Sequence, residues 1–237
     1  MKKHIFAVLL TSFFSHQTIA LGIDNMILIS GQDKQGDFYN IVNDTEIPVY
    51  VKTEISQVNY VNDKPVENIY SRDNLKSWQI TVNPDLFILD SKESKKVAVN
   101  MIDENRKRER DEIYTVSFLP QPHITDSKKV NQMSMQIGFK AYYILPAQIS
   151  DVKYNLDYNK KTGVLTVKNS GNTLVIVELN ACKGAEAKKS KQQLCEASFL
   201  APAGRQKQFV VPAELRQKTM SFDITNHNRS YRNNQVF

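Results

Sequence analysis

The segment from Val130 to Pro146 places an apolar residue at every second position. The alternating row consists of Met133, Met135, Ile137, Phe139, Ala141 and Tyr143. A period of two predicts a long β-strand, because successive side chains of an extended chain point to opposite faces. One face of this strand can enter a core. The methionine-rich row could also fill pockets in another protein's unfinished sheet, since methionine adapts to irregular surfaces.

Shorter alternating segments on both sides of this strand favour an all-β fold. They are residues 49–55, 78–82, 97–101 and 114–118 before it, and 165–167, 174–177 and 220–224 after it. Many short strands with one buried face each are typical of β-sandwiches. Glycine readily adopts positive φ, so the turns Gln35-Gly36-Asp37 and Lys161-Thr162-Gly163 are expected to close hairpins.

The first twenty residues have the layout of a secretory signal peptide. Lys2 and Lys3 precede an apolar run from Ile5 to Phe14, and residues 18–20 end in the small residue Ala20. The run is shorter than the roughly 20 residues that a membrane-spanning helix needs. We therefore expect cleavage after Ala20, export, and no membrane insertion of the mature protein.

The mature chain is long enough for two domains. Removing residues 1–20 leaves 217 of the 237 residues, whereas the commonest domain size is about 100–150 residues. Pro146 ends the long strand, and the strand pattern begins again at Val152. The predicted domains are therefore residues 21–146 and residues 147–237.

The charge distribution does not favour a nucleic-acid partner. The formal charge is +6 and falls to +4 when the two lysines of the leader are removed. The main charged run, residues 103–112, interleaves acidic and basic side chains, which is typical of a solvated loop or a short exposed helix. A stripe that binds nucleic acid would not carry so many carboxylates.

Catalytic and metal-binding motifs are missing from the sequence. The mature chain keeps two histidines, His123 and His227, each among polar neighbours. It contains no nucleophile elbow, phosphate loop or zinc-protease motif. The paired carboxylates at 103–104 and 111–112 lie inside the mixed-charge run, away from the apolar surroundings that prepare a carboxyl group for acid–base work. We expect no enzymatic activity, no cofactor and no metal.

Cys182 and Cys195 are the only cysteines. In an exported protein an isolated pair predicts a disulfide. Such a bond would close a loop of about 14 residues and stabilise the second domain by about 3 kcal/mol. A zinc site is not expected, because no histidine or further cysteine lies nearby to complete four ligands.

The order and spacing of several segments resemble the periplasmic pilus-assembly chaperones of the chaperone–usher pathway. The segments are 41–45 followed by 48–51, 78–84 leading into 95–99, and the closing residues 142–146. The cysteine pair and the divergent first strand are similar to the branch that serves class 5 and common-pilus type fimbriae. The resemblance implies two immunoglobulin-like β-sandwich domains in an L-shaped, boomerang-like arrangement, and a location in the periplasm.

The resemblance also implies donor-strand complementation as the mechanism. Such a chaperone lends a strand to a pilin whose immunoglobulin-like fold lacks one, and then delivers the pilin to an outer-membrane usher. The implied donors are Met133, Met135 and Ile137, with Phe139 continuing the row. No charge interrupts this row, whereas natural edge strands are normally blunted by charge, proline or bulges. Self-association of the free protein, which would shield the edge, is left open.

Two basic residues of the family bind the carboxylate at the pilin C-terminus. Lys140, late on the long strand and facing away from the donors, matches the family's lysine. The family's arginine on the first strand has no counterpart, because residues 26–34 contain no arginine, and Lys34 is the nearest basic residue.

A fimbrial structural subunit or adhesin of immunoglobulin-like fold is the alternative. Subunits usually carry an N-terminal extension of alternating apolar residues for donation to a neighbour. The expected mature start, residues 21–25, is too short before the first strand to serve in this way. Polymerisation of the pure protein on concentration would favour this alternative.

Overall fold

The computed structural model describes residues 19–32, 34–61, 64–121, 136–180, 196–217 and 219–237. Strands dominate these residues, and the predicted all-β fold is confirmed. The helices in these ranges are the short 3-10 turns η1 (Arg72–Ser77) and η3 (Ala213–Leu215). No helix in the described ranges combines the length and the apolar character needed to cross a membrane.

The first domain packs two sheets face to face. One, the β3 sheet, has the strand order β10-β1-β3-β8-β6, and the other, the β9 sheet, has the order β2-β11-β9-β4-β5 with β7 also paired to β4. The β3 sheet contains β1 (Ile19–Ile23), β3 (Phe38–Asn43), β6 (Ile80–Asn83), β8 (Ser94–Met101) and β10 (Gln136–Ile137). The β9 sheet contains β2 (Ile27–Ile29), β4 (Val49–Val61), β5 (Lys64–Ile69), β7 (Leu86–Leu89), β9 (Glu112–Gln121) and β11 (Phe139–Leu145).

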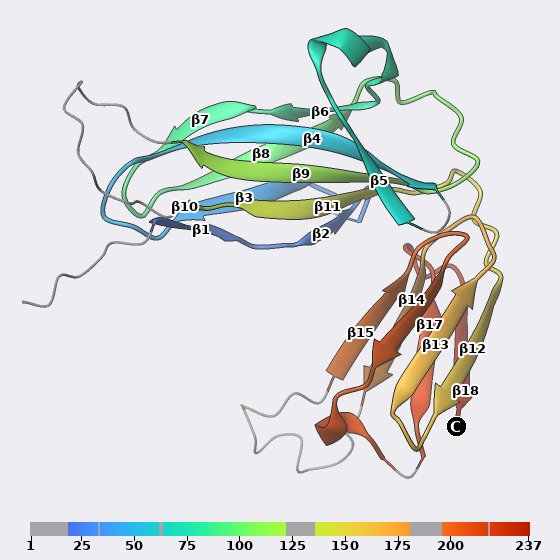
Figure 1. The fold of residues 1–237 in the computed structure, drawn as a ribbon. Helices are drawn as coiled ribbons and strands as arrows, with labels where there is room; N and C mark the ends of the chain where they lie inside the picture. The colour runs from blue at the N-terminus through green and yellow to red at the C-terminus, as the bar shows by residue number, and fades with distance from the viewer. Residues whose placement is uncertain (1–18, 33, 62–63, 122–135, 181–195, 218) are drawn as a thin grey trace, which may run out of the picture.

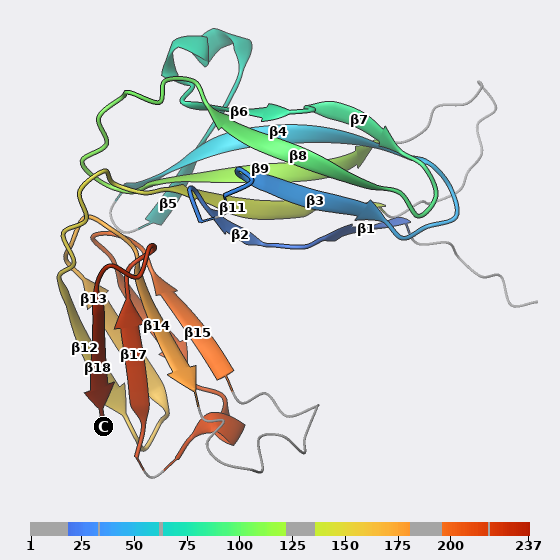
Figure 2. The same ribbon diagram turned by 180° about the vertical axis from the view of Figure 1, so that it is seen from behind.

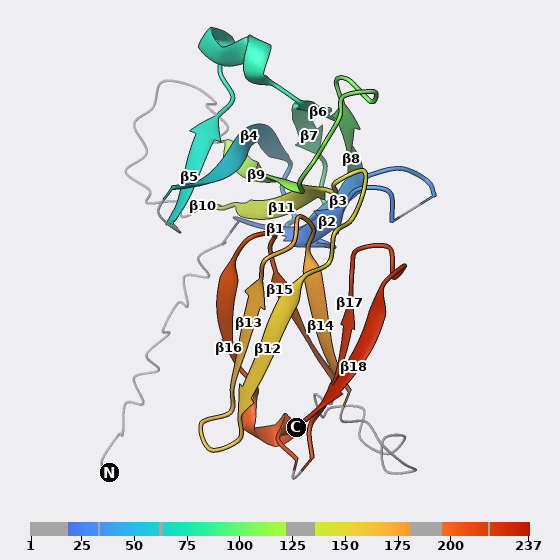
Figure 3. The same ribbon diagram turned by 90° about the vertical axis from the view of Figure 1, so that its right-hand side faces the viewer.

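The second domain is a smaller sandwich of sheets β12-β13-β16 and β15-β14-β17-β18, whose two layers Figure 3 shows edge-on. The first sheet contains β12 (Tyr154–Asn159), β13 (Val164–Asn169) and β16 (Gln206–Val210). The second contains β14 (Val175–Asn180), β15 (Glu196–Ala201), β17 (Ser221–Thr225) and β18 (Arg232–Val236).

Each domain has a core of its own. The first centres on the fully buried rings of Tyr39, Tyr114, Phe118 and Tyr143. The second includes Leu165, Val167, Phe222 and Ile224. The two clusters have no residue in common, and the boundary at 146/147 stays a prediction.

The two domains meet at one end of the first and form an L. Figures 1 and 2 show the second domain at a steep angle to the long axis of the first, so the predicted L-shaped arrangement is confirmed. A small apolar cluster joins them, with Ile29 and Ile144 from the first domain and Leu174 from the second. The cleft inside the L therefore has a packed corner.

The predicted long strand is divided at Gly138. β10 ends at Ile137 and β11 begins at Phe139, and the two belong to different sheets. A Cβ atom at Gly138 would lie 2.5 Å from the carbonyl oxygen of Phe118, which no side chain tolerates. The prediction of one uninterrupted strand is therefore wrong at this residue. Residues 130–135, with Met133 and Met135, lie outside the described residues, as do Cys182, Cys195 and His123.

The two predicted hairpin turns have different outcomes. Gly163, with φ of 72°, lies in the turn between the paired strands β12 and β13, so this hairpin is confirmed. Gly36 also has a positive φ of 105°. However, the strands that flank it, β2 and β3, belong to opposite sheets. The second prediction is wrong, because the turn at Gly36 carries the chain across the sandwich.

A buried asparagine ends the corresponding strand in each domain, Asn43 on β3 and Asn169 on β13. The amide nitrogen of Asn169 donates to the carbonyl oxygens of Thr173 (2.8 Å) and Ala201 (2.9 Å), and its oxygen accepts from the Gly171 N–H (3.0 Å). Asn43 likewise donates across its sandwich to the carbonyl oxygen of Leu89 (3.2 Å). Each asparagine thus closes a turn and ties the two sheets of its domain.

We predict that Asn169→Ala destabilises the second domain by several kcal/mol. The substitution leaves buried carbonyl and N–H groups without their partner, and each such group costs about 1–3 kcal/mol. Urea unfolding followed by far-ultraviolet circular dichroism measures the change. Asn155→Ala on the exposed face of β12 is the control, expected to change stability by no more than about 0.5 kcal/mol. Equal effects of the two substitutions would contradict the prediction.

Candidate donor strand and interdomain cleft

The row of alternating side chains passes from solvent into the core along the strand. Ile137 is 47% exposed, and Phe139 packs against the first core from a partly buried position. Ala141 and Tyr143 are completely buried. The end of the row nearest residues 130–135 is therefore accessible, while the other end fixes the strand in the domain.

The free edge of this strand is covered only in part. Parallel pairing with β2 covers Tyr142 to Ile144, and parallel pairing of β1 with β10 matches Ile19 with Gln136 and Ala20 with Ile137. On this edge of the described chain, residues 138–141 between the two ladders have no paired strand. Both partners of β10 belong to the predicted signal peptide.

Lys140 projects from the opposite face of β11, as predicted. Its neighbours Ala141 and Tyr143 are buried, whereas Lys140 and Tyr142 are exposed. The Lys140 ammonium lies 3.1 and 2.9 Å from the two carboxylate oxygens of Glu67 on β5. Sequence reasoning missed this contact.

Lys34 lies elsewhere, in the exposed loop between β2 and β3. That loop reaches the second domain through Gln32, whose amide donates to the carbonyl oxygen of His227 (2.8 Å). The structure gives no contact that joins Lys34 to Lys140 within the described residues.

A guanidinium group does enter the cleft, from the second domain. Arg205, just before β16, stacks on the ring of Tyr60 at the end of β4, with 4.2 Å between the guanidinium carbon and the ring centroid. Both residues line a cavity of about 180 Å³ between the domains, together with Arg110 and Ala203. Sequence analysis missed Arg205, because its neighbours in the sequence give no sign of contact with the first domain.

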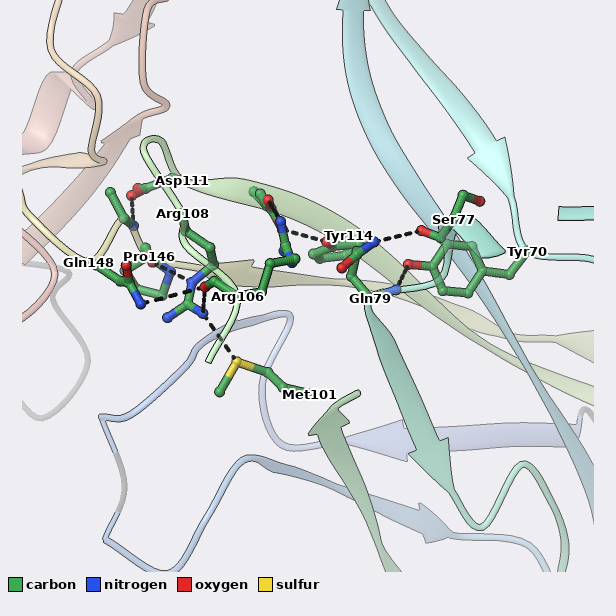
Figure 4. A network of polar contacts seen from close by, with 12 residues as sticks. Tyr70, Ser77, Gln79, Met101, Arg106, Arg108, Asp111, Tyr114, Pro146 and Gln148 are labelled. Atoms are coloured by element: carbon green, nitrogen blue, oxygen red, sulfur yellow. Dashed lines mark hydrogen bonds and ion pairs between the residues drawn. The ribbon is translucent and has the colours of Figure 1, made fainter. Parts of the chain in front are cut away.

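The carboxylate of Asp111 connects the first domain to the second. One oxygen accepts the N–H of Ala147 (2.8 Å), and the other accepts the N–H of Leu174 (2.6 Å) and the hydroxyl of Thr173 (3.3 Å). Figure 4 shows Asp111 beside the linker. Burial raises the pKa of Asp111, although the hydrogen bonds oppose the shift by stabilising the charged form.

Further hydrogen bonds hold the loop of residues 102–111 against the linker. Arg108 donates from Nε to the Pro146 carbonyl oxygen (3.1 Å), and its own carbonyl accepts the Gln148 N–H (3.0 Å). The Asn172 amide donates to the carbonyl oxygens of Glu109 (2.7 Å) and Ile149 (2.9 Å). The prediction of a simple solvated loop or exposed helix is therefore wrong for the second half of the charged run.

Glu112, at the end of the run, belongs to a partly buried network. It pairs with Arg106 and accepts the hydroxyl of Tyr114 (2.7 Å). Burial raises the pKa of Glu112, but the hydrogen bonds from Arg106 and Tyr114 outweigh this effect and leave the pKa lowered. These charges support the corner of the L.

His227 has a structural environment. Its Nδ1 lies 3.4 Å from the hydroxyl of Thr173, and burial lowers its pKa. Among the described residues, no group of three or more histidine, cysteine, aspartate or glutamate side chains could hold a metal ion.

Two solved structures share the fold of this chain. A chain of the complex between the SafA pilin and the SafB chaperone of Salmonella enterica is 12% identical with a TM-score of 0.50, and the match covers 93% of this chain and 98% of that one. The periplasmic chaperone SfaE is 10% identical with a TM-score of 0.50, covering 92% and 98%. The chain therefore has the two-domain β-sandwich fold of fimbrial chaperones.

Sequence comparison identifies the family. The chain belongs to the family described as CS5 fimbrial protein N-terminal domain, whose model matches residues 23–146. An Escherichia coli protein described as an uncharacterized 25.9 kDa protein in the CS5 3′ region is 27% identical over 195 residues, 81% of this chain and 82% of that protein. The predicted resemblance to the fimbrial chaperones is confirmed.

We predict that Asp111→Asn loosens the junction between the domains. An amide can accept one of the two backbone N–H groups but turns its own N–H₂ toward the other, and hydrogen bonds to charged groups contribute about 1.5–3 kcal/mol each. Small-angle X-ray scattering should show a broader distribution of interatomic distances, and calorimetry should separate the melting of the two domains. Asp157→Asn on the exposed face of β12 is the control. Scattering and melting curves identical to the wild type would contradict a role for Asp111 in the junction.

Proposed function

We propose that this protein is a periplasmic chaperone for fimbrial subunits and binds them by donating its strand of residues 130–145. The observation that carries the proposal is the exposed side chain of Ile137 at the open end of this strand. A donated strand satisfies the backbone groups along a subunit's sheet edge while alternate side chains fill its pockets. The fold and the fimbrial family support the proposal.

Removal of the leader would open the donor edge further. Ile19 and Ala20 provide the parallel partners of Gln136 and Ile137. Cleavage after Ala20 would remove both partners, while Leu21, which is buried in the first core, would stay. The mature protein would then offer the backbone of β10 together with the Ile137 side chain.

The same proposal assigns the remaining predicted features. Met133 and Met135 extend the donor row beyond Ile137, and Phe139 continues it toward the core. Cys182 and Cys195 form a disulfide in the second domain, which begins after Pro146. The captured subunit passes to an outer-membrane usher.

Lys140 is proposed to bind the carboxylate at the C-terminus of the subunit. Its ammonium is half exposed and lies on the face opposite the donor row. Arg205, whose guanidinium lines the interdomain cavity, is better placed than Lys34 to act as a second cation for this carboxylate. The second domain would thus supply the group that the first strand lacks.

We predict that Ile137→Asp abolishes subunit capture without unfolding the chaperone. An unpaired carboxylate buried in the subunit's groove costs several kcal/mol, whereas an exposed site in the free protein tolerates it. Coexpression with fimbrial subunits, followed by affinity purification, measures capture, and thermal melts measure stability. Ile88→Asp on β7 is a matched control, because Ile88 is 44% exposed; it should keep capture. A large loss of stability in Ile137→Asp without a subunit present would place Ile137 in the core and exclude it as a donor.

We predict that Lys140→Ala weakens capture about ten- to hundredfold and leaves the chaperone folded. A charge-assisted hydrogen bond contributes about 1.5–3 kcal/mol, and Lys140 lies outside the core. Lys52→Ala, which removes an equally exposed lysine from the same sheet, should bind subunits normally. Unchanged capture by Lys140→Ala would assign the carboxylate to another group.

A structural subunit remains the second candidate, because the family's description names a fimbrial protein. A subunit would polymerise when the pure protein is concentrated. A chaperone would instead form a one-to-one complex with a separate subunit, and gel filtration distinguishes these outcomes.

A further inference from the structure

The ion pair between Lys140 and Glu67 joins strands that are not neighbours. β9 and β4 lie between β11 and β5 in the sheet order. Three strand spacings of about 4.8 Å put roughly 14 Å between the outer two, which is too far for an in-plane contact between these side chains. β5 therefore leans over the outer face of the β9 sheet, and Figures 1 and 3 show it standing away from the plane of β4 and β9.

The hairpin formed by β4 and β5 contacts both sides of the cleft. Glu67 reaches Lys140 of the first domain, and Tyr60 on the paired strand stacks on Arg205 of the second. All residues of β5 are exposed, so core packing does not hold this strand in place. Its position over the sheet depends on polar and aromatic contacts of this kind.

The contact with Lys140 has the form expected of a captured chain terminus. Both oxygens of one carboxylate lie within hydrogen-bonding distance of the ammonium. The side chains of Lys140 and Glu67 are 50% and 36% exposed, so water and a second carboxylate can reach them. An exposed pair is weak, and a better-positioned carboxylate can replace Glu67.

We infer that Glu67 is an internal substitute for the subunit's carboxylate, which occupies Lys140 in the free protein and is displaced when a subunit binds. The inference rests on the proposed function of Lys140. Glu67 keeps the ammonium paired and competes with every incoming carboxylate. It thereby lowers the affinity for ligands that present a carboxylate without a complementary strand edge.

Glu67→Gln tests the inference, and Glu54→Gln is a closely matched control. Glu54 pairs with Lys52 at 2.9 Å on the same sheet, with side chains 40% and 52% exposed. Brief acetylation with N-hydroxysuccinimidyl acetate, followed by peptide mass spectrometry, reports how accessible each amine is. Labelling of Lys140 should rise at least about twofold in Glu67→Gln and stay unchanged in Glu54→Gln. Unchanged labelling of Lys140 in Glu67→Gln would show that the pair does not occupy the amine in solution, and would overturn the inference.

Competition for a subunit then tests displacement. Wild-type and variant proteins with different tags are coexpressed with a limiting amount of the fimbrial subunit that copurifies with the wild type. Glu67→Gln should bind about two- to fivefold more subunit than the wild type, and Glu54→Gln an equal amount. The gain should disappear when both competitors carry Lys140→Ala.

The outcomes separate this inference from the proposed function. If no subunit copurifies with the wild type, the proposed function fails and the inference fails with it. If the wild type captures a subunit and Glu67→Gln captures the same amount or less, only the inference is overturned. A smaller amount would mean that Glu67 positions Lys140 for the subunit rather than competing with it.

Discussion

The carboxylate of Asp111 is the interaction on which the geometry of the cleft depends. It accepts hydrogen bonds from the linker at Ala147 and from the second domain at Leu174, so one side chain fixes three parts of the chain. The apolar cluster of Ile29, Ile144 and Leu174 adds attraction at the same corner, but apolar contacts are non-directional. The hydrogen bonds select one angle, and at that angle Arg205 meets Tyr60.

A fixed angle matters because the two halves of the candidate site come from different domains. Lys140 and the donor row belong to the first domain, whereas Arg205 belongs to the second. A subunit that pairs with the strand can reach both cations only if the corner is rigid. Ordering the corner in advance removes part of the entropy cost of binding.

The sequence predicted those features that depend on local periodicity. Alternation at Ala141 and Tyr143 predicted their burial, and the same pattern placed Lys140 on the other face, because a strand has a strict period of two. Asp111 could not be found in this way. Its partners are backbone N–H groups 36 and 63 residues away, and backbone groups leave no trace in the sequence. The Glu67 contact spans 73 residues and depends on how far a hairpin leans, which no local pattern encodes.

The division of the strand at Gly138 explains how one segment can be both core and donor. On the core side, the Tyr143 hydroxyl donates to Asp37 (2.7 Å), and the Tyr39 hydroxyl donates to the carbonyl oxygen of Tyr142 (2.8 Å), so β11 is held on both its backbone and its side chains. On the other side, Ile137 has little to pack against and stays exposed. A fully buried strand could not be shared, and an unanchored one would lose too much conformational entropy on binding. The anchored half keeps the exposed half extended and aligned, which is what an added strand requires.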